Sequence, residues 1–352
     1  MNTMTEKSTN WDALAGMRFL LAFVVFADHL SVFIPTNSLV RSLHPVAHHS
    51  SVWGFLLISG FSIRNSITLR PQGYLMRRFW RIWPVFLVGY VLAVLPFVSG
   101  KLFIQAPGVL APRPTFEQFI GNLFMLQMNV VAVMTTYSPS WSLAIEELFY
   151  LCAFGFVLCS RGVIWCLIGG SLALAVIAPQ FQPSLHVEQA TPMRALILLC
   201  VWLVGWQFHH NRECVWAKAA LVVVPMISLS YYDPHIPKPR LWWLPVIAPA
   251  LLLINVDAVT LSKRTAAVAR YLGDLSYPLY LIHWPACWCL VALGITSPLL
   301  FWTLPVLASL VVYHGVDKPL RYRYRESKPF LPRFKSRRSR QQSNSSAASL
   351  TE

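Results

Sequence analysis

Charged residues are scarce in this sequence: Asp, Glu, Lys and Arg together make up 12% of the 352 residues. Soluble globular domains contain about 25% charged residues, so the composition excludes an ordinary soluble domain. Hydrophobic residues reach 56%, and 14 Trp and 21 Phe are spread through the apolar runs. Because such runs with aromatic residues near their ends are typical of membrane helices, we expect an integral membrane protein.

Acidic residues are scarcer than basic ones, with 14 Asp and Glu against 29 Lys and Arg, which gives a formal net charge of +15. An excess of this size would suit nucleic acid, but its placement argues otherwise. Ten of the basic residues lie between Lys318 and Arg340, and most of the others flank hydrophobic segments. This distribution indicates a positive-inside membrane topology with a basic cytoplasmic tail, and no nucleic-acid partner is expected.

Cysteine motifs and a cleavable signal peptide are also absent. The seven Cys form no C-x-x-C pair and no spacing with His that is typical of a metal site. Neither a disulfide framework nor a bound metal is therefore expected. The first apolar run, Trp11–Phe33, is long, contains an arginine and is followed by no small-residue cleavage site, so we expect it to remain as a membrane helix.

Eleven apolar runs follow one another along the chain. They occupy residues 11–33, 52–69, 83–98, 119–134, 141–159, 163–179, 194–208, 217–231, 241–256, 275–293 and 297–314. Lys and Arg cluster between runs and should lie on the cytoplasmic side, and this includes the single residue Arg161. Under that constraint the run at 119–134 cannot cross, unless the charge rule misleads at Arg161. Its Gly121, Asn122, Gln127 and Asn129 suit a buried position away from lipid.

The fold prediction is an all-α polytopic membrane protein with about ten transmembrane helices plus one re-entrant or peripheral segment. We expect a cytoplasmic N-terminus at 1–10, a transmembrane domain at 11–317 and a basic, largely disordered cytoplasmic tail at 318–352. Both termini then lie in the cytoplasm. The segment Ser99–Pro114 is expected to be a Pro-rich loop.

Two ionisable residues of the first run share one side of the predicted helix. Arg18 and His29 are eleven residues apart, which returns the helix to within about 20° of its starting direction and separates them by roughly 16 Å. Ionisable groups inside a membrane are costly and therefore indicate function, and this spacing suits the two ends of one extended ligand. The alternative is an arginine that snorkels to the interface and a buried, hydrogen-bonded histidine. Asp28 points about 100° away from His29.

A group of arginines follows the second apolar run, and three of them are close together. Arg77, Arg78 and Arg81 include an R-x-x-R pair, and guanidinium groups match phosphate oxygens bidentately, so a phosphorylated cytosolic ligand is one interpretation. Ordinary positive-inside anchoring is the other.

Two further groups of polar residues lie within apolar segments. Glu146 and Glu147 are adjacent, and one of them is expected to face the protein interior, with Arg18 or His29 as partner. Ser276, Tyr280 and His283 recur at helical spacing and can line one face, although His283 also fits an interfacial belt.

These segments resemble the motifs of one family, both in their order along the chain and in their residues. They are Leu14-x-Gly16-x-Arg18 with His29, Ile58-Ser59-Gly60-Phe61, Arg77-Arg78-x-x-Arg81-x-x-Pro84, Trp141-Ser142-Leu143-x-x-Glu146-Glu147-x-Phe149-Tyr150, Leu272-Gly273-x-x-Ser276-Tyr277-x-x-Tyr280-Leu281-x-His283-Trp284-Pro285, and Asp317-Lys318-Pro319. From about residue 10 to 321 the chain resembles the integral-membrane acyltransferase-3 family, whose members O-acetylate or otherwise O-acylate cell-surface glycans. Asp28 departs from the family pattern. The hydrolase-like domain that some relatives carry at the C-terminus is not expected, since the polar tail is too short for it.

The resemblance implies a cytosolic acyl-CoA donor, foremost acetyl-CoA, and a glycan or lipid-linked glycan acceptor at the bacterial cytoplasmic (inner) membrane. It also implies that His29, Arg18, Arg78 and Arg81 are essential. We expect the CoA phosphates at Arg78 and Arg81, with Arg77 nearby, and the pantetheine arm to extend toward His29. His29 is then the general base, with Arg18 and Glu146 as further catalytic residues and Glu146 orienting the imidazole. A transient acyl-histidine is an open alternative.

The remaining polar residues of these motifs are expected to contact substrate or support the site: Ser142, Glu147, Ser276, Tyr277, Tyr280 and His283. No metal is expected, and membrane lipid is expected around the helices. Two other functions stay open from the residues. One is a family member that transfers succinyl or a longer acyl group. The other is a proton-coupled membrane transporter, although the inverted repeats typical of transporters are not found in the sequence.

Overall fold

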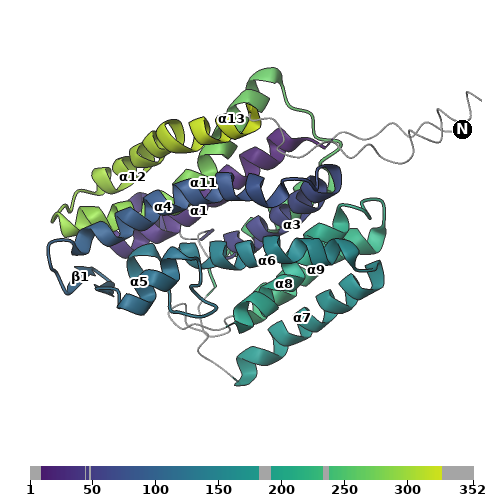
Figure 1. Cartoon of the computed structure of the whole chain (residues 1–352), viewed down its shortest axis with the longest axis horizontal. Helices are drawn as coiled ribbons and strands as arrows, with labels where there is room; N and C mark the ends of the chain where they lie inside the picture. Colours follow the sequence, from purple (N-terminus) through teal and green to yellow (C-terminus); the bar gives the residue numbers. More distant parts are fainter. Residues whose placement is uncertain (1–8, 44, 47–48, 182–191, 233–237, 327–352) are drawn as a thin grey trace, which may run out of the picture.

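The computed structural model describes residues 9–43, 45–46, 49–181, 192–232 and 238–326 (Figure 1). The longer helices are α1 (Trp11–Phe33), α3 (Ser51–Leu69), α4 (Tyr74–Val94), α6 (Ser140–Leu158), α7 (Arg161–Phe181), α8 (Met193–Phe208), α9 (Val215–Tyr232), α10 (Leu244–Ile254), α11 (Lys263–Ala292) and α12 (Pro298–Val312). The shorter elements are α2 (Ser38–Leu43), η1 (Leu95–Phe97), β1 (Phe103–Ala106), β2 (Val109–Pro112), α5 (Phe116–Leu123), η2 (Thr135–Tyr137), η3 (Tyr313–Asp317) and α13 (Lys318–Glu326).

The ten long helices correspond one to one to the ten predicted spans. Within the described residues, seven are long and apolar enough to cross a membrane by length and composition, and α8 and α10 are shorter apolar helices. The tenth, α11, has 30 residues and is about 45 Å long, but it begins with a charged stretch. The prediction of an all-α polytopic membrane protein is confirmed. Most residues of α8 are buried by neighbouring helices, which suits a helix that is apolar on most of its surface apart from Arg194 and Gln207.

The basic clusters gather at one end of the bundle. Arg212 pairs with Asp257 at 2.8 Å, which joins the α8–α9 and α10–α11 connections, and Arg270 pairs with Asp12 at 2.7 Å near the start of α1. The side chain of Gln207 donates to the carbonyl of Arg161 at 3.4 Å, so the start of α7 lies at this end too. Arg161 therefore lies at the same end of the bundle as Arg212 and Arg270.

The segment at 119–134 does not form a spanning helix. Helix α5 has eight residues, about 12 Å of length, and turns follow it. The fully buried Asn122 donates to the carbonyls of Gln118 and Ala132, and the fully buried Gln127 donates to Ser140 Oγ at 3.2 Å. These bonds hold the segment inside protein, as its polar residues predicted.

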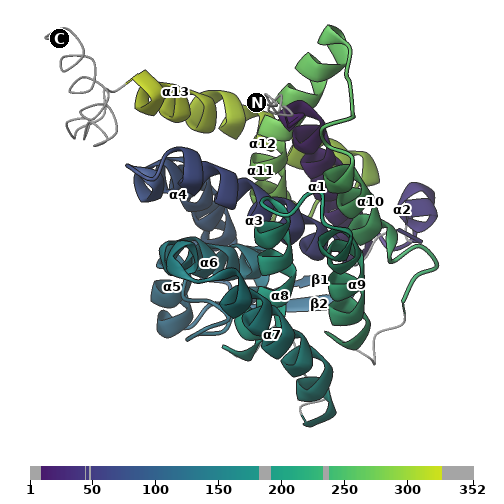
Figure 2. The same ribbon diagram turned by 90° about the vertical axis from the view of Figure 1, so that its right-hand side faces the viewer.

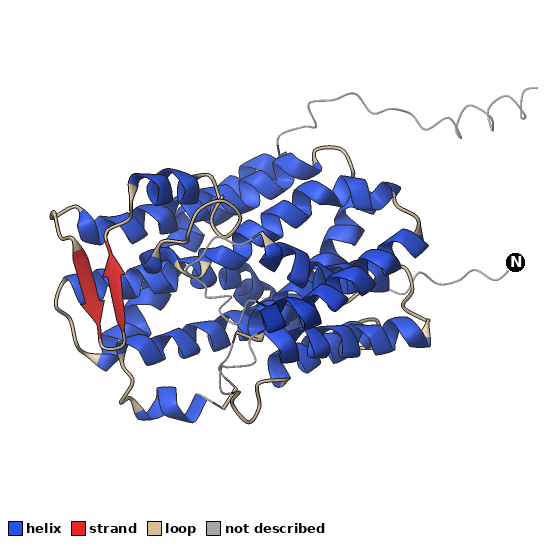
Figure 3. Cartoon of the chain, turned by 90° about the horizontal axis from the view of Figure 1, so that it is seen from below, coloured by secondary structure: helices blue, strands red, loops and turns tan. Residues whose placement is uncertain are grey.

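The expected loop at 99–114 is instead a β-hairpin (Figure 3). Strands β1 and β2 pair antiparallel, with Phe103 opposite Pro112 and Ala106 opposite Val109. Ile104 and Ala106 point inward and alternate with exposed residues, which is the period-two pattern of a strand. The prediction of a loop was wrong because the prolines fall outside the ladder interior, at the turn and at the strand end, where they are tolerated. The first part of the predicted tail, 318–326, forms α13, and residues 327–352 lie outside the described part.

Close helix packing holds the bundle together (Figure 2). Helix α1 packs most extensively on α11, and α3 packs on α8. A Cβ at Gly60 of α3 would collide with the carbonyl oxygen of Trp202, and one at Gly205 of α8 with that of Leu57. Small residues allow backbones to approach in this way, which gives tight packing where no hydrophobic effect drives helices together.

Candidate active site

A long cavity runs between α1, α3, α4, α6 and α11. Its volume is about 310 Å³. Its lining extends along α3 from Val52 to Ser66, which is roughly 21 Å at 1.5 Å per residue. The lining includes Trp11, Arg18, Val52, Phe55, Ser59, Ser62, Asn65, Ser66, Arg78, Arg81, Ser142, Leu143, Glu146, Tyr150, Ser276, Tyr277 and Tyr280. The cavity therefore has the length and the mixed polarity of a site for an extended ligand.

Three arginines from two helices meet at one end of the cavity. Arg18 donates to Ser62 Oγ at 2.6 Å, and Arg78 donates to Ser66 Oγ at 3.2 Å. Arg81 makes no hydrogen bond to any part of the chain that the structure describes, and Arg78 Nε is buried without a partner there. Most guanidinium donors are thus unused, and the like charges repel one another. Such a cluster matches an anion with several oxygens, above all a phosphate.

A hydrogen-bonded chain fixes Glu146 at this same end. Tyr150 donates to Glu146 Oε1 at 2.5 Å, so the hydroxyl of Ser59, 3.2 Å away, donates to Tyr150. The indole of Trp202 donates to Ser59 Oγ at 3.2 Å. Glu146 shares the cavity wall with Arg18, which is one of its two expected partners.

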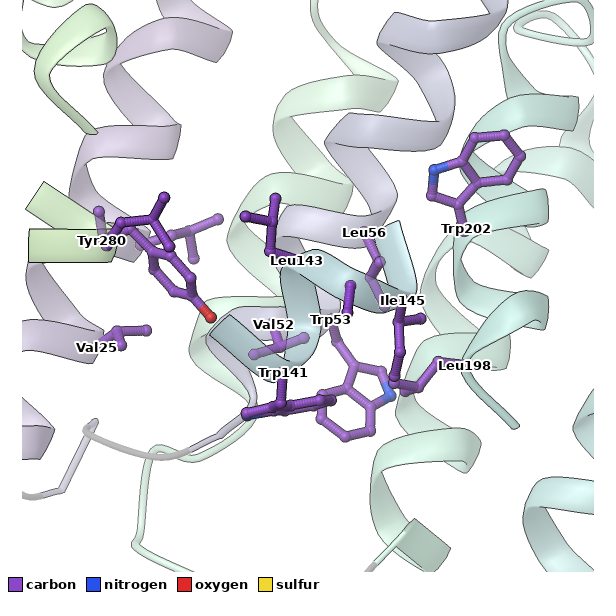
Figure 4. Close-up of a cluster of buried hydrophobic side chains, with 14 of the residues drawn as sticks. Val25, Val52, Trp53, Leu56, Trp141, Leu143, Ile145, Leu198, Trp202 and Tyr280 are labelled. Atoms are coloured by element: carbon purple, nitrogen blue, oxygen red, sulfur yellow. The ribbon is translucent and has the colours of Figure 1, made fainter. Parts of the chain in front are cut away.

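The other end of the cavity is closed by a tyrosine and a serine. The hydroxyls of Tyr280 and Ser142 lie 2.6 Å apart, and Tyr280 also donates toward the carbonyl of Pro139 at 3.2 Å. Figure 4 shows the Tyr280 hydroxyl directed toward α6. Ser276 and Tyr277 line the cavity from the same helix as Tyr280, and their hydroxyls donate to the carbonyls of Gly273 and Ile82.

Two histidines lie just beyond this closed end. His29 Nδ1 is 2.9 Å from His283 Nε2, and the two rings are stacked with centroids 5.2 Å apart. His283 has no exposed surface, whereas His29 is only partly buried. The His283 ring is 6.5 Å from that of Tyr280, centroid to centroid. The partner of the His29 imidazole is therefore His283 and not, as expected, Glu146.

Besides the two histidines, two other expected site residues lie outside the cavity lining. The guanidinium of Arg77 donates to the carbonyls of Gln72 and Arg70, so it stabilises the turn before α4. Glu147 lies behind the wall, where its Oε1 is buried with no hydrogen-bond partner among the described residues. No group of His, Cys, Asp and Glu that could hold a metal ion occurs in the described ranges.

The serine stripe of α3 was not predicted as part of the site. Ser59, Ser62 and Ser66 follow at intervals of three and four residues, so they share one helix face, and that face lines the cavity. Polar residues at this spacing within an apolar run are the signal that identifies them.

Known proteins resemble this chain over most of its length. A family model described as an acyltransferase domain, acyltransferase-3, matches residues 11–313. Acyltransferase MdmB of Streptomyces mycarofaciens is 26% identical over 324 residues, which cover 80% of each chain. Peptidoglycan O-acetyltransferase OatA of Listeria monocytogenes is 26% identical over 336 residues, 83% of this chain and 51% of its own length, so the chain spans about half of that relative. No solved structure matches. The chain belongs to the acyltransferase-3 family and is an integral-membrane O-acyltransferase.

Proposed function

We propose that the protein transfers an acyl group, foremost acetyl, from cytosolic acyl-CoA to a hydroxyl of a cell-surface or exported glycan. One observation supports this proposal above the others. A cavity with three arginines at one end extends about 21 Å along α3 and closes next to His29 at the other. A donor with phosphates at one end and a thioester at the other matches this arrangement.

The donor is proposed to bind with its phosphates against Arg18, Arg78 and Arg81. Their unused N–H groups provide bidentate contacts to phosphate oxygens. Trp11, 38% exposed, offers an aromatic face at the same end of the cavity. The pantetheine arm then follows the serine face of α3, and the acyl group comes to lie near Tyr280.

His29 is proposed to act as general base in a direct transfer. Its imidazole takes the proton of the acceptor hydroxyl, whose oxygen attacks the thioester carbonyl. The C–S bond then breaks, the acyl ester forms, and the CoA thiolate takes up the proton. The hydroxyls of Ser142 and Tyr280 lie at the cavity end where negative charge develops on the carbonyl oxygen, and they can donate to it.

The proposed topology follows from the distribution of charge. The end of the bundle that carries the ion pairs of Arg212 and Arg270 is placed in the cytoplasm, with both termini, in a bacterial cytoplasmic membrane. Acyl-CoA then enters from the cytoplasm, and the acceptor reaches His29 from the opposite side. A glycan acceptor is supported by the relative named as a peptidoglycan O-acetyltransferase.

The test is acyl transfer by the purified protein and by cells. We expect purified protein to consume acetyl-CoA in the presence of a glycan acceptor, and mass spectrometry of surface glycan from cells lacking the gene to show the loss of an acetyl-sized mass. Succinyl-CoA and longer acyl-CoAs, tested in parallel, determine the acyl group. Proton-coupled transport without acyl-CoA consumption would refute the proposal.

A further inference from the structure

We propose that His283 is a positioning residue that holds His29 in the one tautomer able to act as a base at Nε2. This inference rests on the proposed function of His29. It concerns a residue that is close to the cavity but does not line it, and whose partner is 254 residues away in the sequence.

The hydrogen bonds of His283 determine where its proton lies. Its Nδ1 is 2.8 Å from the carbonyl oxygen of Leu279. A carbonyl oxygen only accepts, so Nδ1 carries the hydrogen and donates it. A neutral imidazole carries one N–H, so the His283 Nε2 has a lone pair.

That lone pair in turn determines the tautomer of His29. The His283 Nε2 lies 2.9 Å from His29 Nδ1 and can only accept, so His29 Nδ1 carries the hydrogen. The lone pair of a neutral His29 is therefore on Nε2. This tautomer relay starts at a backbone carbonyl of α11 and ends at the nitrogen that must take the proton of the acceptor.

Burial separates the roles of the two histidines. His283 is fully buried and both of its ring nitrogens are engaged, so it cannot contact an acceptor. His29 is partly exposed and has only Nδ1 engaged within the described residues. When Nε2 of His29 takes a proton, its Nδ1–H becomes part of an imidazolium, and the bond to His283 becomes charge-assisted and stronger. His283 thus stabilises the state that the reaction forms without itself gaining a proton.

Aromatic side chains restrict the orientation of the two imidazole rings. The ring of Trp284 contacts His29 edge-on at 4.8 Å between centroids, and that of Phe26 contacts His283 at 5.6 Å. Trp284 is itself anchored, because its indole donates to the carbonyl of Thr135 at 2.7 Å. An imidazole packed in this way cannot rotate freely to exchange its two nitrogens.

Paired substitutions at His283 test this role through kinetics. In His283→Gln the amide oxygen can replace Nε2 as acceptor, whereas His283→Leu offers none. We expect the leucine variant to lose about 10- to 100-fold in kcat, a part of the roughly 10²–10⁴-fold that a positioned base supplies, with the KM for acetyl-CoA unchanged. The glutamine variant should restore most of the loss. His314→Gln, at an exposed histidine bonded to Tyr271, is the matched control and should leave kcat unchanged. Wild-type kcat in His283→Leu, or an equal loss in His283→Gln, would overturn the proposal.

Nitrogen NMR of the full-length protein tests the tautomer without any activity. With ¹⁵N-labelled histidine, the signals of the pair are identified by their absence in His29→Gln and His283→Gln, and each nitrogen is scored as protonated or bare. We expect a protonated Nδ1 and a bare Nε2 on both rings. A protonated Nε2 on His29 overturns the inference even if acyl transfer is observed. Conversely, a wild-type protein with the expected tautomers but no acyl transfer refutes the proposed function and leaves the relay standing. The NMR result also decides the case if the leucine variant does not fold.

Discussion

Replacing Arg78 by alanine should weaken acyl-CoA binding while leaving the fold intact. The side chain lies between the rings of Tyr74 and Tyr150, with its guanidinium carbon 5.8 and 5.7 Å from their centroids. Its only hydrogen bond to a side chain of the described residues is the one to Ser66. Because Arg18 and Arg81 line the same cavity, removal of one guanidinium also relieves repulsion between like charges.

The expected magnitude follows from the contacts that a phosphate would lose. A hydrogen bond to a charged group contributes about 1.5–3 kcal/mol. Since 1.4 kcal/mol corresponds to a tenfold change, the dissociation constant for acetyl-CoA should rise about 10- to 150-fold. The lost aromatic contacts of about 0.5–1 kcal/mol each reduce stability, but the relieved repulsion offsets part of this, so the melting temperature should change little.

Calorimetric titration of the purified protein with acetyl-CoA measures this change directly. Arg77→Ala is the matched control, because Arg77 is on the same helix but bonds to the carbonyls of Arg70 and Gln72 outside the cavity. We expect the control to bind acetyl-CoA with nearly unchanged affinity. Unchanged affinity in Arg78→Ala, or an equal loss in Arg77→Ala, would refute a phosphate site and leave both arginines as determinants of topology.

Three further changes give separate tests. His29→Gln should lower kcat by about 10²–10⁴-fold at unchanged affinity for acetyl-CoA, measured with radiolabelled donor; a fully active variant would exclude His29 as the base. Gly60→Ala should lower the free energy of unfolding by about 1–3 kcal/mol, because the added Cβ meets a carbonyl oxygen of α8. Gly169→Ala is the control, because Gly169 has open space around it and the change should leave stability as it is. Thermal unfolding in detergent measures both variants. Tyr280→Phe removes the bond to Ser142 and should raise the ratio of acetyl-CoA hydrolysis to acyl transfer. An unchanged ratio would show that this hydroxyl pair does not keep water from the reacting thioester.

The membrane-spanning helices could be predicted from the sequence because each is determined by local composition. Ten apolar runs became ten helices, and the predicted basic positions Arg161, Arg212 and Arg270 lie at one end of the bundle. The run at 119–134 was correctly excluded, since buried amides such as Asn122 and Gln127 need protein partners. The hairpin at 103–112 was missed because its alternation covers only four residues per strand.

Contacts between helices could be predicted only in part. The placement of Arg18 and His29 along one helix follows from its periodicity, and Arg78 and Glu146 do lie in the same cavity as Arg18. The choice of His283 as the partner of His29 depends on the relative rotation of α1 and α11, which the pattern of one sequence does not determine. Glu146 was expected in this role because an acidic group orients the imidazole of a catalytic triad, but Tyr150 holds it at the arginine end.

In the proposed mechanism, helix α11 connects the donor site to the reaction centre. Tyr277, Tyr280 and His283 follow one another along it, from the cavity wall to the closed end and then to the histidine pair. Pro278 lies within this stretch and Pro285 just after it. Each proline removes one backbone hydrogen bond, so the helix bends here more easily than an unbroken helix would. The cavity ends at Tyr280, and His29 lies beyond it. The thioester can therefore meet an acceptor beside His29 only if the hydrogen bond between Tyr280 and Ser142 breaks or rearranges. A donor that fills the cavity would offer new partners to those hydroxyls. The same tyrosine can therefore close the site before the donor binds and stabilise the reacting carbonyl once it has bound.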